Sequence, residues 1–380
     1  MKKNNLKLAA KTLLLTVALA CYSRAQAGKF DLGEKFYGWS SNYVAPANFS
    51  GYEIWTPVSL NFKLAGGLNL FAQGEFGNAG YTDSLAGTST TYFTAFSDTV
   101  AGGELSFKSF GVPSQLTIGF NIPTGNPTWE ARQIAANMPT DLVNSRYQGR
   151  GFGVSGMYGL SFPAGSGEVG LSGGYMYSGA YNANLNLGPA DNLDLGDALF
   201  LAMNHVQQFK GNQNQIIRLS GFAFLPTTQN GVNNFQMGPN INASYSWVNP
   251  KALSFSLGGQ YFLPAQRLLN GTLGTEPKNS YGPRIYLNPS YAIGDFTLAG
   301  RAKYVFANGY ALTESFYQGG GLLLGVEPSL KVRFDEGSSL KFLGSFDNIT
   351  AQNAGIDSLG NRTNVTYSLW TFGTNYEVRF

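Results

Sequence analysis

The chain has 380 residues, of which 14% are aromatic and only 12% are charged, and it contains 49 glycines. Soluble globular proteins have about 25% charged residues, so this composition argues against an ordinary soluble domain and suits a sheet between lipid and water. The formal net charge of +3 comes from the N-terminus, which holds Lys2, Lys3, Lys7, Lys11 and Arg24. Without these, 20 basic and 22 acidic residues remain, a net charge of −2 that gives no support to a nucleic-acid partner.

The N-terminus has the pattern of a secretory signal peptide. Its lysine-rich start is followed by the apolar run 12–20 and by Ala25-Gln26-Ala27. The run is far shorter than the roughly 20 residues of a membrane-spanning helix. We expect residues 1–27 to be a signal peptide and residues 28–380 to form one exported domain. The alternative is a lipoprotein signal ending at Cys21. Cleavage after Ala27 removes this single cysteine, so no disulfide is expected.

Apolar and polar residues alternate at a period of two along much of the chain, which predicts antiparallel β-strands. The segments 253–263, 296–306 and 370–380 show the alternation clearly. In the last of them Trp370, Phe372, Tyr376 and Phe380 share one face. A helix would not sort these residues by face, so the predicted fold class is all-β.

The apolar faces could lie in the core of a soluble sandwich or against lipid. Aromatic residues distinguish the two, because they cluster near strand ends, as at Tyr245 and Trp247 or Trp370 and Phe372, where an interfacial girdle would place them. Beyond the signal peptide no apolar stretch has the length of a membrane helix, so a membrane-spanning chain must be a closed barrel.

Turn signals divide the chain into hairpins with alternating short and long connections. The short ones fall at 65–67, 110–114, 163–168, 211–214, 248–252, 292–295 and 334–339. The long polar ones fall at 78–90, 125–147, 181–198, 227–234, 266–279, 308–314 and 351–363. With 30–41 as the first strand, we predict a single transmembrane antiparallel β-barrel of about 16 strands, or about 14 if the opening segment is a plug and one hairpin is misread.

In these features the chain resembles the Gram-negative outer-membrane porin superfamily. The resemblance rests on the signal peptide, the length of the mature chain and the terminal strand, in which the aromatic Tyr376 lies four residues before Phe380. It implies that the barrel-assembly machinery reads Tyr376 and Phe380, that the protein resides in the cell outer membrane with lipid and lipopolysaccharide around it, and that it forms a homotrimer, as such porins often do.

A second resemblance rests on Ile118-Gly119-Phe120-Asn121-Ile122-Pro123-Thr124-Gly125 and on Gly196-Asp197. These segments are similar to those of outer-membrane transporters of the phenol-degradation meta-pathway and long-chain fatty-acid type. That resemblance implies a channel for hydrophobic compounds with an N-terminal hatch. Here the segment 28–51 is short and partly strand-like, which departs from a hatch.

The long segment 125–147 has helical character, with Thr128 as an N-cap candidate, and we expect a short helix there. It joins the fifth and sixth predicted strands, and the porin resemblance implies that a loop at this position folds into the lumen and constricts it. The candidate constriction residues are Glu130, Arg132, Asp141 and Arg146. The alternative is an external loop with a surface helix.

The strand phase predicts which charged residues face the lumen, where charge sets ion preference. The inward residues singled out are Arg218, Arg284, Arg301, Lys303, Lys331, Arg333 and Glu327. Basic residues exceed acidic ones on this phase, which predicts a mild preference for anions. The alternative is that salt bridges among them fill a narrower barrel. Phe71, Phe222, Phe224, Phe262 and Tyr286 share the inward phase and suit a conduit for hydrophobic compounds instead.

No motif indicates catalysis. The single histidine, His205, has no nucleophile motif beside it, so we expect no catalytic residues, no enzyme activity and no cofactor. Asp191, Asp194 and Asp197 could hold Ca²⁺ in an external loop, although their spacing is not that of an EF-hand, and no metal site is predicted.

The functional expectation is a porin-like channel for passive diffusion of small hydrophilic solutes, anions among them. One alternative is a channel for small hydrophobic compounds of the fatty-acid or aromatic-hydrocarbon type. The other is a structural or adhesive barrel whose lumen is closed.

Overall fold

A computed structural model describes residues 27–42, 49–83, 89–125, 149–182, 192–250, 252–269, 272–279, 281–308, 319–356 and 362–379. The predicted signal peptide, apart from Ala27, and the predicted helix within 125–147 lie outside these residues. Within the described residues, no helix has the length and hydropathy to cross a membrane.

Seventeen strands form one antiparallel sheet. In chain order they are β1 (Ala27–Asn42), β2 (Phe49–Lys63), β3 (Leu68–Asp83), β4 (Ser89–Phe96), β5 (Thr99–Ser109), β6 (Val112–Ile122), β7 (Gly153–Ala164), β8 (Gly167–Ser178), β11 (Ala198–Phe209), β12 (Gln213–Phe224), β15 (Asn240–Val248), β16 (Leu253–Phe262), β19 (Arg284–Ile293), β20 (Phe296–Val305), β21 (Gly321–Arg333), β22 (Ser338–Ile356) and β23 (Arg362–Arg379).

The sheet closes into a barrel, because β23 pairs with β1 from Lys29 opposite Arg379 to Asn42 opposite Thr366. β4 and β5 both pair with β3, one after the other along its length, and so share one place in the wall. The 17 strands therefore occupy 16 wall positions, and the predicted all-β barrel of about 16 strands is confirmed. β1 belongs to this wall, so the segment that it forms is neither a plug nor a hatch.

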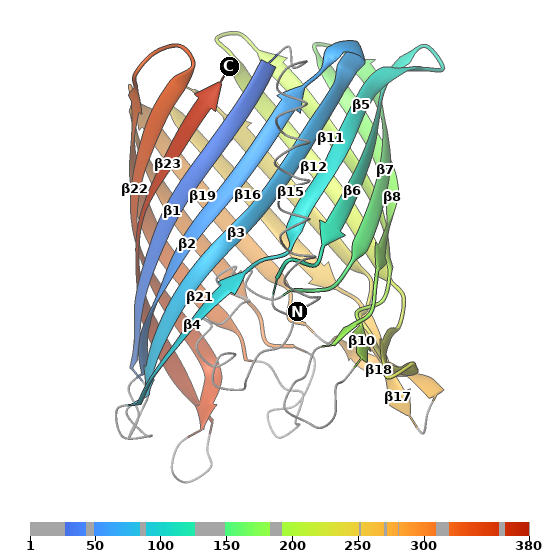
Figure 1. Cartoon of the computed structure of the whole chain (residues 1–380), viewed down its shortest axis with the longest axis vertical. Helices are drawn as coiled ribbons and strands as arrows, with labels where there is room; N and C mark the ends of the chain where they lie inside the picture. Colours follow the sequence, from blue (N-terminus) through green and yellow to red (C-terminus); the bar gives the residue numbers. More distant parts are fainter. Residues whose placement is uncertain are drawn as a thin grey trace, which may run out of the picture.

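The seven predicted short connections lie at one end of the barrel, together with the C-terminus (Figure 1). They comprise a 3-10 turn, η1 (Ala65–Gly67), and tight hairpin turns such as the one at Phe110 and Gly111, which both have positive φ angles, 52° and 80°. Such a turn matches the twist of the strands that it joins. Short turns mark the periplasmic end of bacterial barrels.

At the opposite end, three of the predicted long loops contain strands rather than irregular chain. A second antiparallel sheet runs in the order β18 (Thr272–Asn279), β17 (Pro264–Leu269), β14 (Val232–Gln236), β13 (Thr227–Gln229), β10 (Asn192–Asp194) and β9 (Tyr181–Asn182). We call it the cap sheet, and Figure 1 shows part of it below the barrel wall. Its strands come from three successive external connections, which pair with one another and so satisfy their backbone hydrogen bonds. The segments 78–90 and 351–363 were also predicted too long, since β3 and β22 run on to Asp83 and Ile356.

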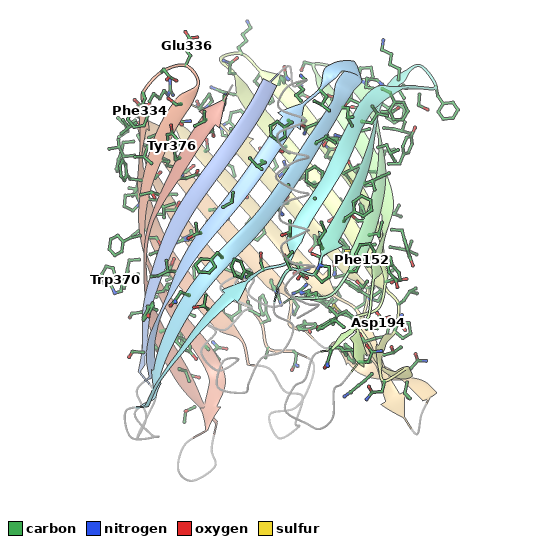
Figure 2. The ribbon with its side chains drawn as sticks, in the orientation of Figure 1. Phe152, Asp194, Phe334, Glu336, Trp370 and Tyr376 are labelled. Carbon is green, nitrogen blue, oxygen red and sulfur yellow. The ribbon has the colours of Figure 1, made fainter. Side chains whose placement is uncertain are left out.

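The outer face of the wall is apolar and carries aromatic pairs. The rings of Phe346 and Trp370, on the neighbouring strands β22 and β23, lie 4.4 Å apart. Those of Phe209 on β11 and Trp247 on β15, with β12 between the two strands, lie 5.3 Å apart. Trp370 is 52% exposed and points away from the barrel (Figure 2). This distribution matches the lipid-facing belt with aromatic girdles that transmembrane barrels have.

Candidate functional site: the inner wall of the barrel

The wall strands carry their exposed apolar side chains on one face, and most of their charged side chains lie on the other. In β21, Leu322, Leu324 and Leu330 are exposed, whereas Glu327 and Lys331 alternate with them and lie on the other face. Directly opposed residues of antiparallel strands share a face, so the register extends this assignment around the barrel. We call the face opposite to the exposed apolar side chains the inner face.

The charged residues singled out in the sequence lie on the inner face. One register row runs from Arg218 through Ser244, Gly258 and Tyr286 to Lys303. The others alternate with exposed apolar neighbours in the same way. The set consists of Arg218, Arg284, Arg301, Lys303, Glu327, Lys331 and Arg333.

Arg301 forms ion pairs with two carboxylates of this face. Its Nη1 lies 3.4 Å from Oε2 of Glu327, and its Nη2 donates a 2.7 Å hydrogen bond to Oδ2 of Asp347. The contact with Asp347 passes over Gly325 of β21, where a Cβ would collide with Oδ1 of Asp347. We call Arg301, Glu327 and Asp347 the charge triad. Its two carboxylates outnumber its one cation, so the triad has no positive charge to offer an anion.

Two further ion pairs lie close to the periplasmic end. Nη2 of Arg333 is 3.6 Å from Oδ1 of Asp295, and both side chains are more than half exposed. Nε of Arg379 donates a 2.8 Å hydrogen bond to Oε1 of Glu377. Exposed pairs of this kind contribute about 0–1 kcal/mol, so they hold the arginines only weakly.

Lys331 of β21 and Lys341 of β22 are directly opposed in the register, and both lie on the inner face. The next residue in this row is the neutral Asn375 of β23. Like charges directly opposite each other on a sheet destabilise it. Among the described residues, this pair places two positive charges side by side on the inner face, where an anion would relieve their repulsion.

The long segment 126–148 leaves and rejoins the wall at one carboxylate. Oδ1 of Asp98 accepts a 3.0 Å hydrogen bond from the amide N–H of Gly125, and Oδ2 accepts one of 2.6 Å from the amide N–H of Arg150. Oδ2 also accepts a 2.7 Å hydrogen bond from Nδ2 of Asn121, which lies on the inner face of β6. Asp98 lies between β4 and β5 and thus fixes both ends of the segment to each other and to the wall.

The segment that Asp98 anchors connects β6 and β7, the fifth and sixth wall positions, as the sequence predicts. The candidate constriction residues within it, Glu130, Arg132, Asp141 and Arg146, lie outside the described residues. Tyr376 of the terminal strand is 38% exposed on the outer face near the periplasmic end (Figure 2). Phe380 lies outside the described residues.

His205 lies on the outer face of β11, opposite Ile217 and Val169, and thus away from the lumen. In the described parts of the chain, no group of three His, Cys, Asp or Glu side chains could hold a metal ion. Asp194 and Asp197 instead support the cap sheet: Oδ1 of Asp194 accepts a hydrogen bond from the amide of Gly196, and Oδ1 of Asp197 accepts one from the amide of Ser178, each of 2.9 Å.

Sequence reasoning missed the role of Asp98. The signal was present in Ser97-Asp98-Thr99, where three polar residues interrupt an otherwise regular strand pattern. It also missed the cavity beneath the cap sheet, which has a volume of about 670 Å³ and is lined by Phe224, Phe235, Met237, Tyr281 and Arg150 among others. Three of these residues lie in external connections whose pairing no local pattern reveals.

No protein-family model matches this sequence, and no curated protein matches it either. Solved structures do resemble it. Acinetobacter baumannii OccAB1 is 8% identical, with 93% of this chain and 97% of that chain covered and a TM-score of 0.50. Pseudomonas aeruginosa OccK7 (OpdD) is 12% identical, with 93% and 100% covered and a TM-score of 0.48.

A mutant of the Rh. blastica porin is 10% identical, with 92% of this chain and 99% of that chain covered and a TM-score of 0.38. At such identities a likeness shows the fold alone. A closed antiparallel barrel with an apolar, aromatic-girdled outer face belongs in the bacterial outer membrane, and the fold of this chain is that of the porin-type β-barrels.

Proposed function

We propose that the protein is a channel for passive diffusion of small hydrophilic solutes across the outer membrane, with a preference for anions. The observation that carries the proposal is the closed wall, which is apolar outside and charged inside. An unpaired charge is costly to bury in an apolar interior. Inner-face cations such as Arg218 and Lys331 are therefore best explained by a lumen that contains water.

A hydroxyl-rich part of the inner wall supports hydrophilic solutes. A hollow of about 670 Å³ lies against β5 to β12, and its polar lining includes Ser106, Gln115, Ser161, Ser172, Asn204, Arg218 and Ser220. Such groups exchange hydrogen bonds with water and with polar solutes at little cost. Two glycines of this lining, Gly159 and Gly170, add no side chain to the lumen.

The preference for anions rests on which cations the acidic residues leave without compensation. The charge triad compensates Arg301, whereas Lys331 and Lys341 repel each other across neighbouring strands. Clustered charge of one sign in a pore selects ions of the opposite sign. The opposed lysines near the periplasmic exit are thus one source of the proposed anion preference.

We further propose that the segment 126–148 folds into the lumen and forms its constriction, with Glu130, Arg132, Asp141 and Arg146 at the narrowest point. Asp98 supports this, because it holds both ends of the segment against an inner-face residue, Asn121.

The proposal includes partners. Tyr376 and Phe380 would be recognised by the barrel-assembly machinery, and lipopolysaccharide and lipid would surround the apolar belt. Assembly as a homotrimer would require one flat sector of that belt to be covered by a second copy.

Inner-face aromatic residues favour a second candidate, a channel for small hydrophobic compounds. Phe71, Phe222, Phe224, Phe262 and Tyr286 all share the face of Arg218 and Lys303. A hatch of the fatty-acid type is not formed by residues 28–42, which lie in wall strand β1. A barrel with a closed lumen and a structural or adhesive role remains the third candidate.

Reversal potentials in a KCl gradient across a planar bilayer test the anion preference. We expect the wild-type protein to pass chloride more readily than potassium. The double variant Lys331→Gln/Lys341→Gln should lose most of this preference, and Lys210→Gln, in a periplasmic turn, is the matched control. Cation preference in the wild type, or an unchanged reversal potential in the double variant, would refute the assignment.

A further inference from the structure

Three aromatic rings on the inner face cover glycines of the neighbouring strand. A Cβ at Gly174 would lie 2.5 Å from the ring of Phe200, and one at Gly102 would lie 2.6 Å from Cζ of Phe71. Tyr286 covers Gly258 in the same way, at 2.5 Å from Cζ. Each ring and its glycine are directly opposed in the register.

This placement has a geometrical consequence. A ring that covers a glycine lies close to the backbone of the wall and leaves the lumen wider than a ring held above a side chain would. Glycine is the residue that allows this approach, because any side chain would occupy the space of the ring.

Around Phe200 the rings form a continuous surface. Phe222, directly opposite Phe200 on β12, has its ring centroid 5.9 Å from that of Phe200 with 28° between the planes. Phe224 follows on the same face of β12, with its centroid 6.4 Å from that of Phe222 and 14° between the planes. The three side chains thus form one contiguous aromatic cluster with near-parallel rings on the inner face. We call Phe200, Phe222 and Phe224 the aromatic strip.

The strip has polar groups beside it and free space at one end. Phe224 lines the cavity of about 670 Å³ beneath the cap sheet, a size typical of sites for small molecules. Ser220, next to Phe222 on the same face, and Asn242 are joined by a 3.4 Å hydrogen bond. A solute on the strip would thus meet ring faces below it and hydroxyl and amide groups at its edge.

We propose that the aromatic strip is a stacking site for solutes that present a flat ring face, either an aromatic ring or the apolar face of a pyranose. Stacking on an aromatic side chain favours ring-bearing ligands whatever their charge. The inference rests on the proposed function, because such solutes reach the strip through a water-filled lumen. It names the solute class that this lumen prefers among hydrophilic molecules of equal size.

The test uses three neutral probes on the purified full-length protein: catechol, methyl β-glucoside and the open-chain polyol sorbitol. Transient block of single-channel KCl current reports their residence in the lumen. We expect a ring-bearing probe to block the current and sorbitol not to do so. The probe that blocks identifies the ring as aromatic or pyranose.

The variant Phe222→Leu keeps the apolar volume but removes the flat face, and it should weaken block about tenfold. Phe342→Leu, on the lipid-facing side of β22, is the matched control and should leave block unchanged. Equal block by sorbitol and both ring probes, or no difference between Phe222→Leu and the wild type, would overturn the proposal.

Equilibrium dialysis of the same probes against the protein in detergent separates this inference from the proposed function. Absence of KCl conductance would contradict the proposed channel. Dialysis would still measure binding of the probes to the aromatic strip, because it does not require current through the lumen. Ring-probe binding that Phe222→Leu weakens supports the stacking site even then. No binding of either ring probe refutes it, whatever the conductance.

Discussion

Arg301 on β20 and Asp347 on β22 form a 2.7 Å hydrogen-bonded ion pair across the whole width of the strand between them. The intervening residue is Gly325, opposite both of them in the register. Any larger residue there would collide with the carboxylate. Two charges 46 positions apart in the sequence thus depend on one glycine.

Replacing Asp347 by asparagine should make the pore more selective for anions. The change removes one negative charge from the inner face and leaves Arg301 with Glu327 alone. Loss of a charge-assisted hydrogen bond should also cost about 1–3 kcal/mol of stability. Reversal potentials measure the change in selectivity, and thermal unfolding of the same preparation measures the change in stability. A shift of the selectivity toward cations would contradict the placement of Asp347 in the lumen.

Gly325→Ala should lower stability with a smaller effect on selectivity than Asp347→Asn. The added methyl group displaces the Asp347 carboxylate from Arg301 but leaves the number of lumen charges unchanged. Gly156→Ala on β7 is the matched control, since a Cβ there would have no neighbour within 4 Å. The measurement is the midpoint temperature of thermal unfolding of both variants. Equal midpoints for Gly325→Ala and Gly156→Ala would show that the Arg301–Asp347 contact does not require the glycine.

Asp98→Asn should loosen the segment 126–148. An asparagine keeps one acceptor oxygen, but its Nδ2 cannot accept hydrogen bonds. With Nδ2 in the place of Oδ2, the hydrogen bonds from Arg150 and Asn121 would be lost. If this segment constricts the pore, the variant should show a larger and noisier single-channel current. Limited proteolysis should cut the segment faster than in the wild type. Glu336→Gln, exposed in the periplasmic turn after β21, is the control. Identical currents in Asp98→Asn and the wild type would argue against a constriction held by Asp98.

Asp335 in the periplasmic turn after β21 should give the fold a small acid sensitivity. Hydrogen bonds from the Ser338 hydroxyl and from the Gly337 and Ser338 amides lower the pKa of this carboxyl below its ordinary 3.8. A lowered pKa in the folded state means that the stabilisation is present above the unfolded-state pKa and is lost as the pH falls through the folded-state value.

Asp335→Asn should therefore be less stable than the wild type at neutral pH, and the gap should close below about pH 4. Thermal unfolding between about pH 7 and pH 3 provides the measurement. A gap that stays constant over this range would mean that the Asp335 charge contributes nothing.

The fold was largely predictable because a membrane barrel repeats one simple pattern. Alternation at a period of two gave the wall strands, because one face of each strand meets lipid and requires apolar side chains. Turn signals gave the short connections between them. The cap sheet was not predictable in this way. Its strands β9, β10 and β13 have only two or three residues, and pairing between separate loops, rather than local periodicity, makes them strands.

The candidate site was predictable in its faces but not in its contacts. The alternation along each strand placed Arg301, Glu327 and Lys331 on one face, because successive residues of a strand point to opposite faces of the sheet. Which cations are paired depends on the register between strands, and register is set by the turns and by positions such as Gly325. The excess of basic residues in the sequence therefore overstates the free positive charge, because Arg301 is compensated while Lys331 is not.

Conductance of single protein molecules in a planar bilayer tests the central claim most directly. Protein purified from the outer membrane of an expressing bacterium should insert and give steady, stepwise KCl currents, with chloride carrying the larger share. Bilayers that receive the folded protein and stay electrically silent would contradict a water-filled channel and would favour the barrel with a closed lumen.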